Sequence, residues 1–569
     1  MPTVDPVEAP QTPTTRSTPT APRPRRATLS LREPTAKRMV RWRIRLLLFS
    51  VAEILIAQAI VLVVLPSYAR VFSFEVVCVA VAFLGALPVA ASLMQYAIVG
   101  FHAWRIKYRN LKPYYPRVTV IVPAWNEETV IGNTIDHLFA MEYPEDRFRV
   151  VVVDDASIDK TPDILREKVQ QYGDRLTGMR RTECGNGKAH TLNFGLKRIL
   201  SDDWAEAVLV MDADVLFEPD ALRKMTRHLS DPHVGAVTAY IKEGTHDGNY
   251  LTRFIAFEYI TAQAIGRRAQ NVLGVLACLA GGAQLHSREN LEAIGGRIDT
   301  SSLAEDTVTT FRTQLGGRRV EFEGNAIVWA EEPSNIDGLW KQRMRWARGN
   351  LQVSFQYVSI WGKQRSAFGN LARAPFLLLW FTVLLMPLTM LASSVGLLSL
   401  YALHAATAWA VLRILWLWAA IAYVFSIGIG LAIDWRTARA CWREAIMFPG
   451  AVALLIMLYS VHPALFEVDM VRWLGHIGVA VMPRAGTVLA VFMYSWLILC
   501  VPLAYLAKVA SESEGFKWLA PIIMYLVGYG PFLCAVTSGS YVNELLNAGT
   551  HWEKTTKNGR VMLSAGGQR

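Results

Sequence analysis

Long apolar runs stand in two groups along the chain, with an interval of mixed polarity between them. Two runs precede this interval and five follow it, and most reach the roughly 20 apolar residues that an α-helix needs to cross a bilayer. The pattern predicts a membrane protein whose middle part, residues 101–368, is large enough for one α/β domain. The seven runs cover residues 46–68, 74–99, 375–401, 408–433, 446–466, 488–507 and 519–536.

Within the middle part, short runs of β-branched and other apolar residues alternate with segments of helical periodicity. Residues 118–122, 149–153 and 207–211 are typical of buried parallel strands, which are apolar on both faces. Strand–helix–strand alternation predicts right-handed crossovers and a parallel sheet. Ligands of open α/β sheets bind at the carboxyl ends of the strands, so the polar residues that follow each strand are candidates for a binding site.

Acidic residues follow the first two of these strands. Glu127 comes after the first strand, and Asp154 and Asp155 come after the second. We predict that these side chains recognise the base and ribose of a nucleotide. A structural alternative remains open for the aspartate pair, which could form a turn and a helix cap together with Ser157 and Asp159.

A second acidic pair, Asp212 and Asp214, follows the third strand. Carboxylate oxygens suit Mg²⁺ or Mn²⁺, and such a cation would neutralise the diphosphate of a leaving nucleotide. We therefore predict that both residues bind metal and that Asp212 also contacts the donor. Lys188, after the glycines at 185 and 187, precedes a helical segment and suits a phosphate, although an ordinary loop with a surface lysine would look the same.

Glu305 and Asp306 open another helical segment. Asp306 is the candidate general base that accepts the proton of an attacking acceptor hydroxyl, with Glu305 beside it as a second catalytic candidate. An acid at a helix start is more often a simple cap. Because glycoside hydrolases need two flanking carboxylates and no nucleotide site, one base together with a nucleotide site favours transfer over hydrolysis.

A predicted helix over residues 336–357 carries Gln342, Arg345 and Trp346 on one face, by the i, i+3, i+4 rule. The guanidinium can neutralise a diphosphate, and the indole can stack on a sugar ring. The alternative is a basic amphipathic helix that lies on the membrane. Both interpretations can hold together if the remaining basic and aromatic residues contact lipid: Trp340, Arg343 and Arg348.

Charge and cysteine content bear on the membrane topology of the protein and on its binding partners. The net charge is +11, and residues 1–36 are rich in Pro, Thr and Arg, which predicts a disordered tail. The basic residues that follow, between 37 and 45, favour an N-terminus on the cytoplasmic side; two crossings then return the chain, so the middle domain is expected in the cytoplasm. We interpret the excess of basic residues as a signal for membrane topology and as contact with anionic lipid, rather than as a nucleic-acid-binding surface. The six cysteines form no C-x-x-C pair, which argues against a zinc site.

The acidic motifs, followed by Gln342-Arg343-Met344-Arg345-Trp346, resemble the processive branch of the family 2 glycosyltransferases, which includes cellulose, chitin, hyaluronan and poly-N-acetylglucosamine synthases. The resemblance covers roughly residues 115–370 and extends to the flanking membrane layout. It implies a cytoplasmic α/β domain of the GT-A type, inserted between transmembrane helices, that uses a UDP-sugar donor and Mg²⁺ or Mn²⁺. It also implies a growing polysaccharide as acceptor, a channel through the membrane helices, and location in a bacterial inner membrane.

Departures from the family pattern bear on which sugar the protein would polymerise. Ala304 stands where cellulose synthases usually carry threonine, and residues 279–284 replace their aromatic-Cys-Gly-Ser motif. The segment 258–268 is closer to the poly-N-acetylglucosamine type, so an N-acetylglucosamine polymer is the first hypothesis. A β-glucan, chitin-like or hyaluronan-like product remains an alternative. Gly282 and Gln284 are the positions where we expect sugar selectivity to be encoded.

Two other functions are weighed against polymer synthesis: single transfer of a sugar to a lipid, and transport controlled by a nucleotide-sensing domain. The topology also leaves a question, because basic residues after 433 and in the C-terminal tail both favour the cytoplasm, whereas five crossings after the catalytic domain would place the tail outside. Either one segment is interfacial or re-entrant, with residues 446–484 as the candidate that does not cross, or the tail departs from the rule. The predicted division is a disordered tail (1–36), two transmembrane helices (37–100), the catalytic domain (101–335), interfacial helices (336–372), four to five transmembrane helices (373–540) and a tail (541–569).

Overall fold

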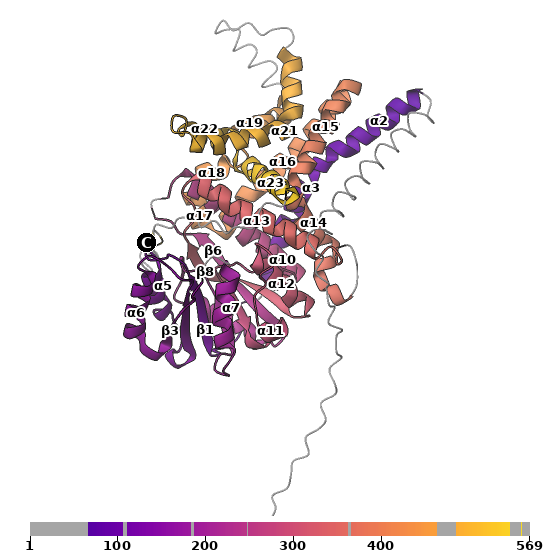
Figure 1. Ribbon diagram of the computed structural model, residues 1–569. Helices are drawn as coiled ribbons and strands as arrows, with labels where there is room; N and C mark the ends of the chain where they lie inside the picture. The colour runs from indigo at the N-terminus through magenta and orange to yellow at the C-terminus, as the bar shows by residue number, and fades with distance from the viewer. Residues whose placement is uncertain are drawn as a thin grey trace, which may run out of the picture.

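The computed structural model describes residues 67–105, 108, 111–183, 187–246, 248–361, 366–463, 485–546, 559 and 561. The predicted N-terminal tail, nearly all of the first apolar run, Cys184 and Gly185 lie outside these residues. Figure 1 shows a sheet covered by helices at one end of the molecule and the long apolar helices at the other, with α13 (Ile336–Gln356) between them.

The catalytic part is built on one eight-stranded sheet in the order β3-β2-β1-β4-β7-β6-β8-β5. The three predicted strands are present as β1, β2 and β4, and β1 pairs in parallel with both of the others. β7 is antiparallel to both of its neighbours, β4 and β6, so the sheet is mixed but mostly parallel, and the predicted fold class is confirmed. The strands are β1 Val118–Ala124, β2 Phe148–Asp154, β3 Leu176–Arg180, β4 Ala207–Val210, β5 Val215–Phe217, β6 Val234–Glu243, β7 Gln284–Ser287 and β8 Arg319–Ala330.

Helices cover both faces of this sheet because successive residues of its strands point to opposite faces. On one face Ile121 and Val153 pack against Leu192 and Leu196. On the other face the alternate strand residues pack against α5, with Ile135 in the contact. The helices of this part are α5 Ile131–Phe139, α6 Thr161–Tyr172, α7 Lys188–Ile199, α8 Ala221–Thr226, α9 Tyr250–Tyr259, the π-helix η6 Ile260–Gly266, α10 Arg267–Leu273, α11 Arg288–Ala293 and α12 Glu305–Leu315.

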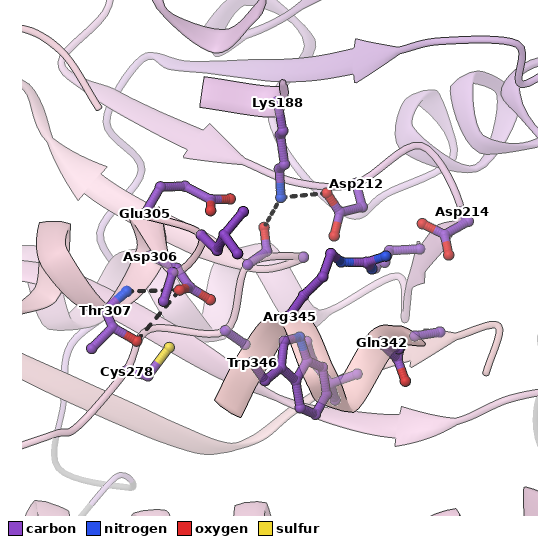
Figure 2. Close-up of a pocket in the computed structure, with 18 of the residues that line it drawn as sticks. Lys188, Asp212, Asp214, Cys278, Glu305, Asp306, Thr307, Gln342, Arg345 and Trp346 are labelled. Atoms are coloured by element: carbon purple, nitrogen blue, oxygen red, sulfur yellow. Dashed lines mark hydrogen bonds and ion pairs between the residues drawn. The ribbon is translucent and has the colours of Figure 1, made fainter. Parts of the chain in front are cut away.

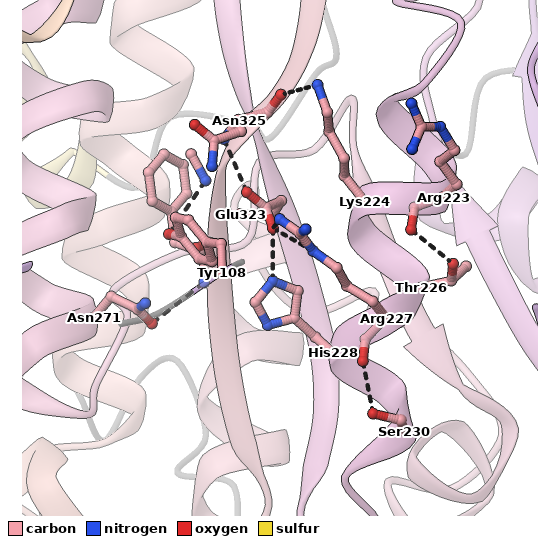
Figure 3. Close-up of polar contacts among 12 residues, drawn as sticks. Tyr108, Arg223, Lys224, Thr226, Arg227, His228, Ser230, Asn271, Glu323 and Asn325 are labelled. Atoms are coloured by element: carbon pink, nitrogen blue, oxygen red, sulfur yellow. Dashed lines mark hydrogen bonds and ion pairs between the residues drawn. The ribbon is translucent and has the colours of Figure 1, made fainter. Parts of the chain in front are cut away.

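A buried polar cluster holds the segment that leads from the first membrane helices into the catalytic part (Figure 3). The hydroxyl of Tyr108 donates to the carbonyl of Phe322 at 2.5 Å, and its ring packs against His228. Nε2 of His228 lies 2.9 Å from Oε2 of Glu323, which also accepts from Arg227. Burial raises the pKa of Tyr108 above its ordinary value, so the phenol stays protonated and donates this bond. The cluster fixes β8 to the entry segment.

Four described helices are long and apolar enough to cross a membrane: Val71–Val99, Met386–Leu403, Ala405–Ile433 and Thr487–Glu512. The run predicted over 375–401 is divided into two helices at Leu385, because Pro387 in the first turn of the second helix cannot donate a backbone hydrogen bond. The helices of this part are α2 Ser67–Ala82, α3 Leu87–Val99, α14 Ala374–Leu384, α15 Met386–Leu403, α16 Ala405–Ile433, α17 Trp435–Ala440, α18 Trp442–Ile446, α19 Ala451–Val461, α21 Ala485–Glu512, α22 Leu519–Val527 and α23 Tyr529–Leu545.

Two of the long apolar helices contact the catalytic part at one end. α16 ends at Asp434, which pairs with Lys242 of β6, and α21 reaches the catalytic part at its end, where Lys508 pairs with Asp337. Both helices therefore have one end at the catalytic part. Residues 464–484 lie outside the described residues, so the expectation that 446–484 do not cross stays a prediction. α22 and α23 are bent by 100° at their junction, as in a broken span or a re-entrant loop. Val561 bridges to Thr245 of the catalytic part.

Candidate active site

One cavity of about 490 Å³ lies at the carboxyl ends of β1, β2 and β4, between the sheet and α13. Every residue named as a site candidate lines this cavity except Asp154. Segments that are more than 200 residues apart in the sequence therefore meet in one place. The ten are Glu127, Asp155, Lys188, Asp212, Asp214, Glu305, Asp306, Gln342, Arg345 and Trp346.

Asp154 is the one correction among these candidates. Its carboxylate is buried beneath the loop after β2, where Oδ1 accepts from the backbone N of Ser157 at 3.0 Å and Oδ2 lies 3.2 Å from Arg180. The turn-forming alternative thus describes Asp154, while Asp155 faces the cavity and pairs with Arg181. Sequence spacing could not separate the two because adjacent residues after a strand point in different directions.

The loops after β1 and β2 are bound to each other in an unusual conformation. Asn126 and Ala156 both have positive φ, 54° and 55°, which costs free energy for residues with a β-carbon. Oδ1 of Asn126 accepts from the backbone N of Ile158 at 2.9 Å, and the backbone N of Asn126 donates to Ser157 at 2.8 Å. These bonds hold Glu127 and Asp155 at the cavity edge.

Lys188, the first residue of α7, reaches across the cavity floor (Figure 2). Its Nζ lies 2.5 Å from Oδ1 of Asp212 and donates to the carbonyl of Gly281 at 3.1 Å. Burial alone would lower the pKa of Lys188, but the carboxylates of Asp212 and Glu305 raise it above its ordinary value. The lysine is therefore a fixed positive charge beside the predicted metal and diphosphate site.

Asp212 and Asp214 offer two carboxylates to a cation. Among the residues that the structure describes, no group of three or more His, Cys, Asp or Glu side chains could hold a metal ion. Two carboxylates nevertheless fit Mg²⁺ or Mn²⁺, which usually complete their shells with substrate phosphates and water. Gly282 keeps this place open, because a β-carbon there would lie 2.9 Å from Val215 and 3.5 Å from Oδ2 of Asp212.

Glu305 and Asp306 lie at the start of α12, and the side chain of Lys188 lies between them and Asp212 (Figure 2). Oδ1 of Asp306 accepts from the backbone N of Thr307 at 2.7 Å, while Ala304 occupies the cap position without a side-chain bond. Asp306 is thus not the N-cap of its helix. Burial and then the charge of Asp306 raise the pKa of Glu305 to about 7.

The helix α13 brings Gln342, Arg345 and Trp346 to the cavity wall opposite the sheet. Nε2 of the buried Gln342 donates to Oε2 of Glu332 at 3.0 Å, and its Oε1 accepts from Arg343 at 2.6 Å. Trp346 is 41% exposed, so part of its surface is open to a ligand. The three side chains share one face, as their spacing predicts.

The other side of α13 faces protein rather than lipid. Arg343 pairs with Glu258 and Arg348 with Glu544 of α23, at 2.7 and 2.9 Å. Trp340 packs edge-on against Tyr505 of α21 and Phe532 of α23. The prediction that Trp340, Arg343 and Arg348 contact lipid is therefore wrong; the physical reason is that α21 and α23 cover this face.

Several cavity residues were missed from the sequence. Tyr259, whose hydroxyl donates to Glu332, and Arg267 come from α9 and α10, and Cys278 and Gly281 come from the loop before β7. Tyr259 and Arg267 lie in the segment 258–268, and Gly281 lies in 279–284, which the sequence pointed to only for the choice of sugar. The acid pair Glu331-Glu332 at the end of β8 was a further signal, because it repeats the acid-after-strand pattern. Gln284, predicted to encode sugar selectivity, is instead buried in the sheet beside His286, while Gly282 does line the cavity.

The C-terminal residues that the structure describes also reach this site. The backbone N of Gly559 donates to Oε2 of Glu331 at 3.0 Å, and Val561 pairs with Thr245. Glu331 lines the cavity. Gly559 thus contacts the rim of the site, which no sequence pattern indicated.

Comparison with known proteins gives one family match and several relatives. The model described as "Glycosyltransferase like family 2" matches residues 116–349. A probable glycosyltransferase, YdaM of Bacillus subtilis, is 32% identical over 255 residues, which are 44% of this chain and 60% of that protein. A beta-monoglucosyldiacylglycerol synthase of Synechocystis is 32% identical over 247 residues, 43% of this chain and 50% of that protein.

A poly-beta-1,6-N-acetyl-D-glucosamine synthase of Staphylococcus epidermidis is 27% identical over 237 residues, 42% of this chain and 55% of that protein. The chain thus spans between half and three-fifths of the length of these relatives. Among solved structures, a mannosyltransferase of Pyrobaculum calidifontis in complex with GDP-Man and Mn²⁺ superposes with a TM-score of 0.46 at 25% identity, and covers 69% of this chain and 99% of its own.

Proposed function

Residues 116–349 are a glycosyltransferase family 2 domain, and from that premise we propose that the protein transfers sugar from a UDP-sugar to an acceptor hydroxyl at a membrane and extends a β-linked polysaccharide. The observation that carries the proposal is the meeting of Lys188 and Asp212, Asp306, and Trp346 in one cavity. These residues supply a leaving-group site, a base and a sugar-stacking surface. The match to this family model argues against the transporter alternative.

The donor diphosphate belongs at the Lys188 side of the cavity. Asp212 and Asp214 would hold Mg²⁺ or Mn²⁺ there, and the bound cation would neutralise the phosphate oxygens of the departing nucleotide. The ammonium group of Lys188 adds a fixed positive charge, and the guanidinium of Arg345 extends from α13 toward the same region (Figure 2). Glu127 and Asp155, beyond Asp212 at the sheet edge, would recognise the base and ribose.

The acceptor belongs between Asp306 and Trp346. Asp306 takes the proton from the acceptor hydroxyl as its oxygen forms the bond to the anomeric carbon, and the bond from that carbon to the diphosphate breaks on the opposite side. A single displacement of this kind inverts the anomeric centre, so an α-linked donor gives a β-linked product. The Glu305 carboxylate attracts the ammonium group of Lys188. Because the pKa of Glu305 is raised to about 7, this side chain can also accept the proton that Asp306 takes up.

The product is proposed to be an N-acetylglucosamine polymer made on the cytoplasmic side of a bacterial inner membrane. The relative from Staphylococcus epidermidis supports this choice of sugar, and the four long apolar helices support passage of the chain through the membrane part. A β-glucan, chitin-like or hyaluronan-like polymer would use the same catalytic residues.

A second candidate is the transfer of one sugar to a membrane lipid. The relative from Synechocystis supports it, since its name describes synthesis of a glucosylated diacylglycerol and its identity is higher, at 32%. The two functions differ in product length and not in the chemistry at Asp306.

The test gives purified protein in lipid nanodiscs a radiolabelled UDP-N-acetylglucosamine or UDP-glucose with Mn²⁺, and separates products by size and by extraction into organic solvent. Long product that a matching glycosidase digests supports polymerisation. Label found only in a lipid that carries one sugar supports the second candidate instead. The Asp306→Asn variant is the control, because either reaction must stop when the base is lost.

A further inference from the structure

The short helices α17 and α18 present an unpaired basic and aromatic face. They follow α16 directly and lie between the sheet and the long apolar helices in Figure 1. The exposed positions recur at the spacing of one helical face, whereas Ala438, Cys441 and Ala445 on the other face are buried. The charged and large apolar residues among the exposed positions are Trp435, Arg436, Arg439, Trp442, Arg443 and Ile446, named here the α17–α18 face.

The acidic side chains of this segment lie on its buried side, and the basic side chains lie on its exposed side. Its two acids, Asp434 and Glu444, are buried and pair with Lys242 and Arg253 of the catalytic part, at 2.7 and 2.9 Å. The hydroxyl of Tyr525 also donates to Glu444 at 2.7 Å. The inner side is therefore neutralised and fixed to protein.

The outer side keeps its positive charge. Arg436, Arg439 and Arg443 form no ion pair with any carboxylate of the described residues. Arg443 lies over the ring of Trp442, 5.4 Å from its centre, which leaves the guanidinium group available to an anion. Trp435 and Trp442 are 58% and 54% exposed, which is unusual for so large an apolar side chain unless a partner covers it.

The position of the segment identifies the partner. One end, Asp434, contacts the catalytic part, and at the other end the carbonyl of Ile446 accepts from the hydroxyl of Tyr423 at 2.7 Å. Tyr423 lies ten residues before the end of α16, or about 15 Å along the helix axis. The α17–α18 face thus runs from the catalytic part back along α16, a helix long and apolar enough to cross a membrane, and this is the region where lipid headgroups would meet the protein.

We infer that the α17–α18 face binds the headgroups of anionic phospholipids in the leaflet next to the catalytic part. Tryptophan side chains prefer this interfacial depth, and arginine donates two parallel hydrogen bonds to a phosphate. Each basic residue near an anionic leaflet adds to the attraction, and no acid on this face opposes it. Since Asp434, Glu444 and Arg253 join the same segment to the catalytic part, lipid bound here would set the height of the active site above the bilayer.

The test measures bound lipid directly, so it does not depend on the proposed transferase activity. The full chain is purified from a membrane that contains phosphatidylglycerol and phosphatidylcholine with matched acyl chains, and native mass spectrometry counts the lipids retained. Wild-type protein should retain phosphatidylglycerol preferentially. In the R436Q/R439Q/R443Q variant this preference should fall about tenfold or more, because three charges that attract the leaflet are lost.

Two further variants make the result specific. R166Q/K197Q/R198Q removes the same charge from exposed positions of α6 and α7 and should keep the preference. R436K/R439K/R443K keeps the charge and should retain most of the preference at low ionic strength and lose it as salt is raised. An unchanged preference in R436Q/R439Q/R443Q, or no preference in the wild type, overturns the inference; the latter is expected if an acidic protein covers this face instead.

Discussion

Nη2 of Arg343 lies 2.7 Å from Oε2 of Glu258, and the hydroxyl of Tyr529 donates to the same oxygen at the same distance. The three residues belong to α13, α9 and α23. Both charged groups are largely withdrawn from solvent, with side-chain exposures of 5% and 13%. One carboxylate thereby joins the helix of the active site to the bent helix pair of the membrane part.

Removing one member of this pair should destabilise the protein strongly. Arg343→Met leaves the Glu258 carboxylate buried beside a hydroxyl alone, and a buried charge that loses its partner costs about 3–5 kcal/mol. We expect a large fall in the melting temperature of the detergent-purified protein. The R343M/E258M double variant is the matched control, and it should recover most of the loss because no unpaired charge remains. A double variant as unstable as the single one would show that packing, not charge, is what matters here.

Lys188→Ala should impair turnover far more than folding. The variant leaves Asp212 without its fixed positive neighbour at 2.5 Å, and loss of one electrostatic contact to a developing charge typically lowers kcat by about 10²–10³-fold. Steady-state kinetics with the UDP-sugar would show this, and Lys188→Arg should recover part of the rate. A melting temperature close to that of the wild type would exclude unfolding as the cause, whereas full activity would remove Lys188 from the donor site.

The strands β1, β2 and β4 and the acids that follow them were readable from the sequence because both depend on local patterns. Val118 to Val122 is apolar at every position, as a strand covered on both faces must be, and Asp212 follows a strand of the same kind. The partners of Arg343 and Trp340 were not readable, since Glu258, Tyr505 and Phe532 lie tens to hundreds of residues away. Asp154 and Asp155 show the limit most clearly, because neighbours in sequence have different surroundings.

Chelation of divalent cations should abolish transfer, and Asp214→Asn should raise the Mn²⁺ concentration needed for half-maximal rate. Asp212 and Asp214 line the cavity and are the two carboxylates proposed to hold the ion, and removal of one charged ligand weakens a site that relies on charge. Titration of EDTA-treated enzyme with Mn²⁺ provides the measurement. Glu331→Gln, on the cavity rim, serves as the control and should leave the Mn²⁺ requirement unchanged. Full activity after chelation would exclude the metal.

Glu305 should make the protein less stable as the pH rises toward neutrality. Burial and the charge of Asp306 raise its pKa in the folded state to about 7, above the ordinary value of 4.5. A raised pKa means that the folded state holds a proton which the unfolded state has released, so stability is fully present below pH 4.5 and is lost as the pH rises through about 7. The melting temperature without ligand should fall over this window.

The Glu305→Gln variant isolates that contribution. Glutamine cannot ionise, so the fall in melting temperature between pH 4.5 and 7 should be smaller in the variant than in the wild type. Glu243, whose pKa burial likewise raises to about 7, should account for part of what remains, and Glu243→Gln tests this. Identical pH profiles for wild type and Glu305→Gln would mean that Glu305 does not titrate in this range.

Gly349→Ala should separate α13 from the start of α12 and slow catalysis. A β-carbon at this position would lie 2.6 Å from the β-carbon of Ala304 and 2.8 Å from its backbone N, distances that no contact tolerates. Ala304 precedes Glu305 and Asp306, so any shift moves the base relative to Trp346. Overpacking of this kind typically costs about 1–3 kcal/mol, and a displacement near 1 Å can lower the rate about 10²-fold.

The matched control is Gly428→Ala in α16, where a β-carbon would meet nothing within 4 Å. Both changes replace glycine by alanine inside a helix, which alone favours the helix by about 1 kcal/mol. Gly428→Ala should therefore keep full activity and melt no lower than the wild type. If Gly349→Ala transfers sugar as fast as Gly428→Ala, then the close contact between α13 and α12 does not set the geometry of the base.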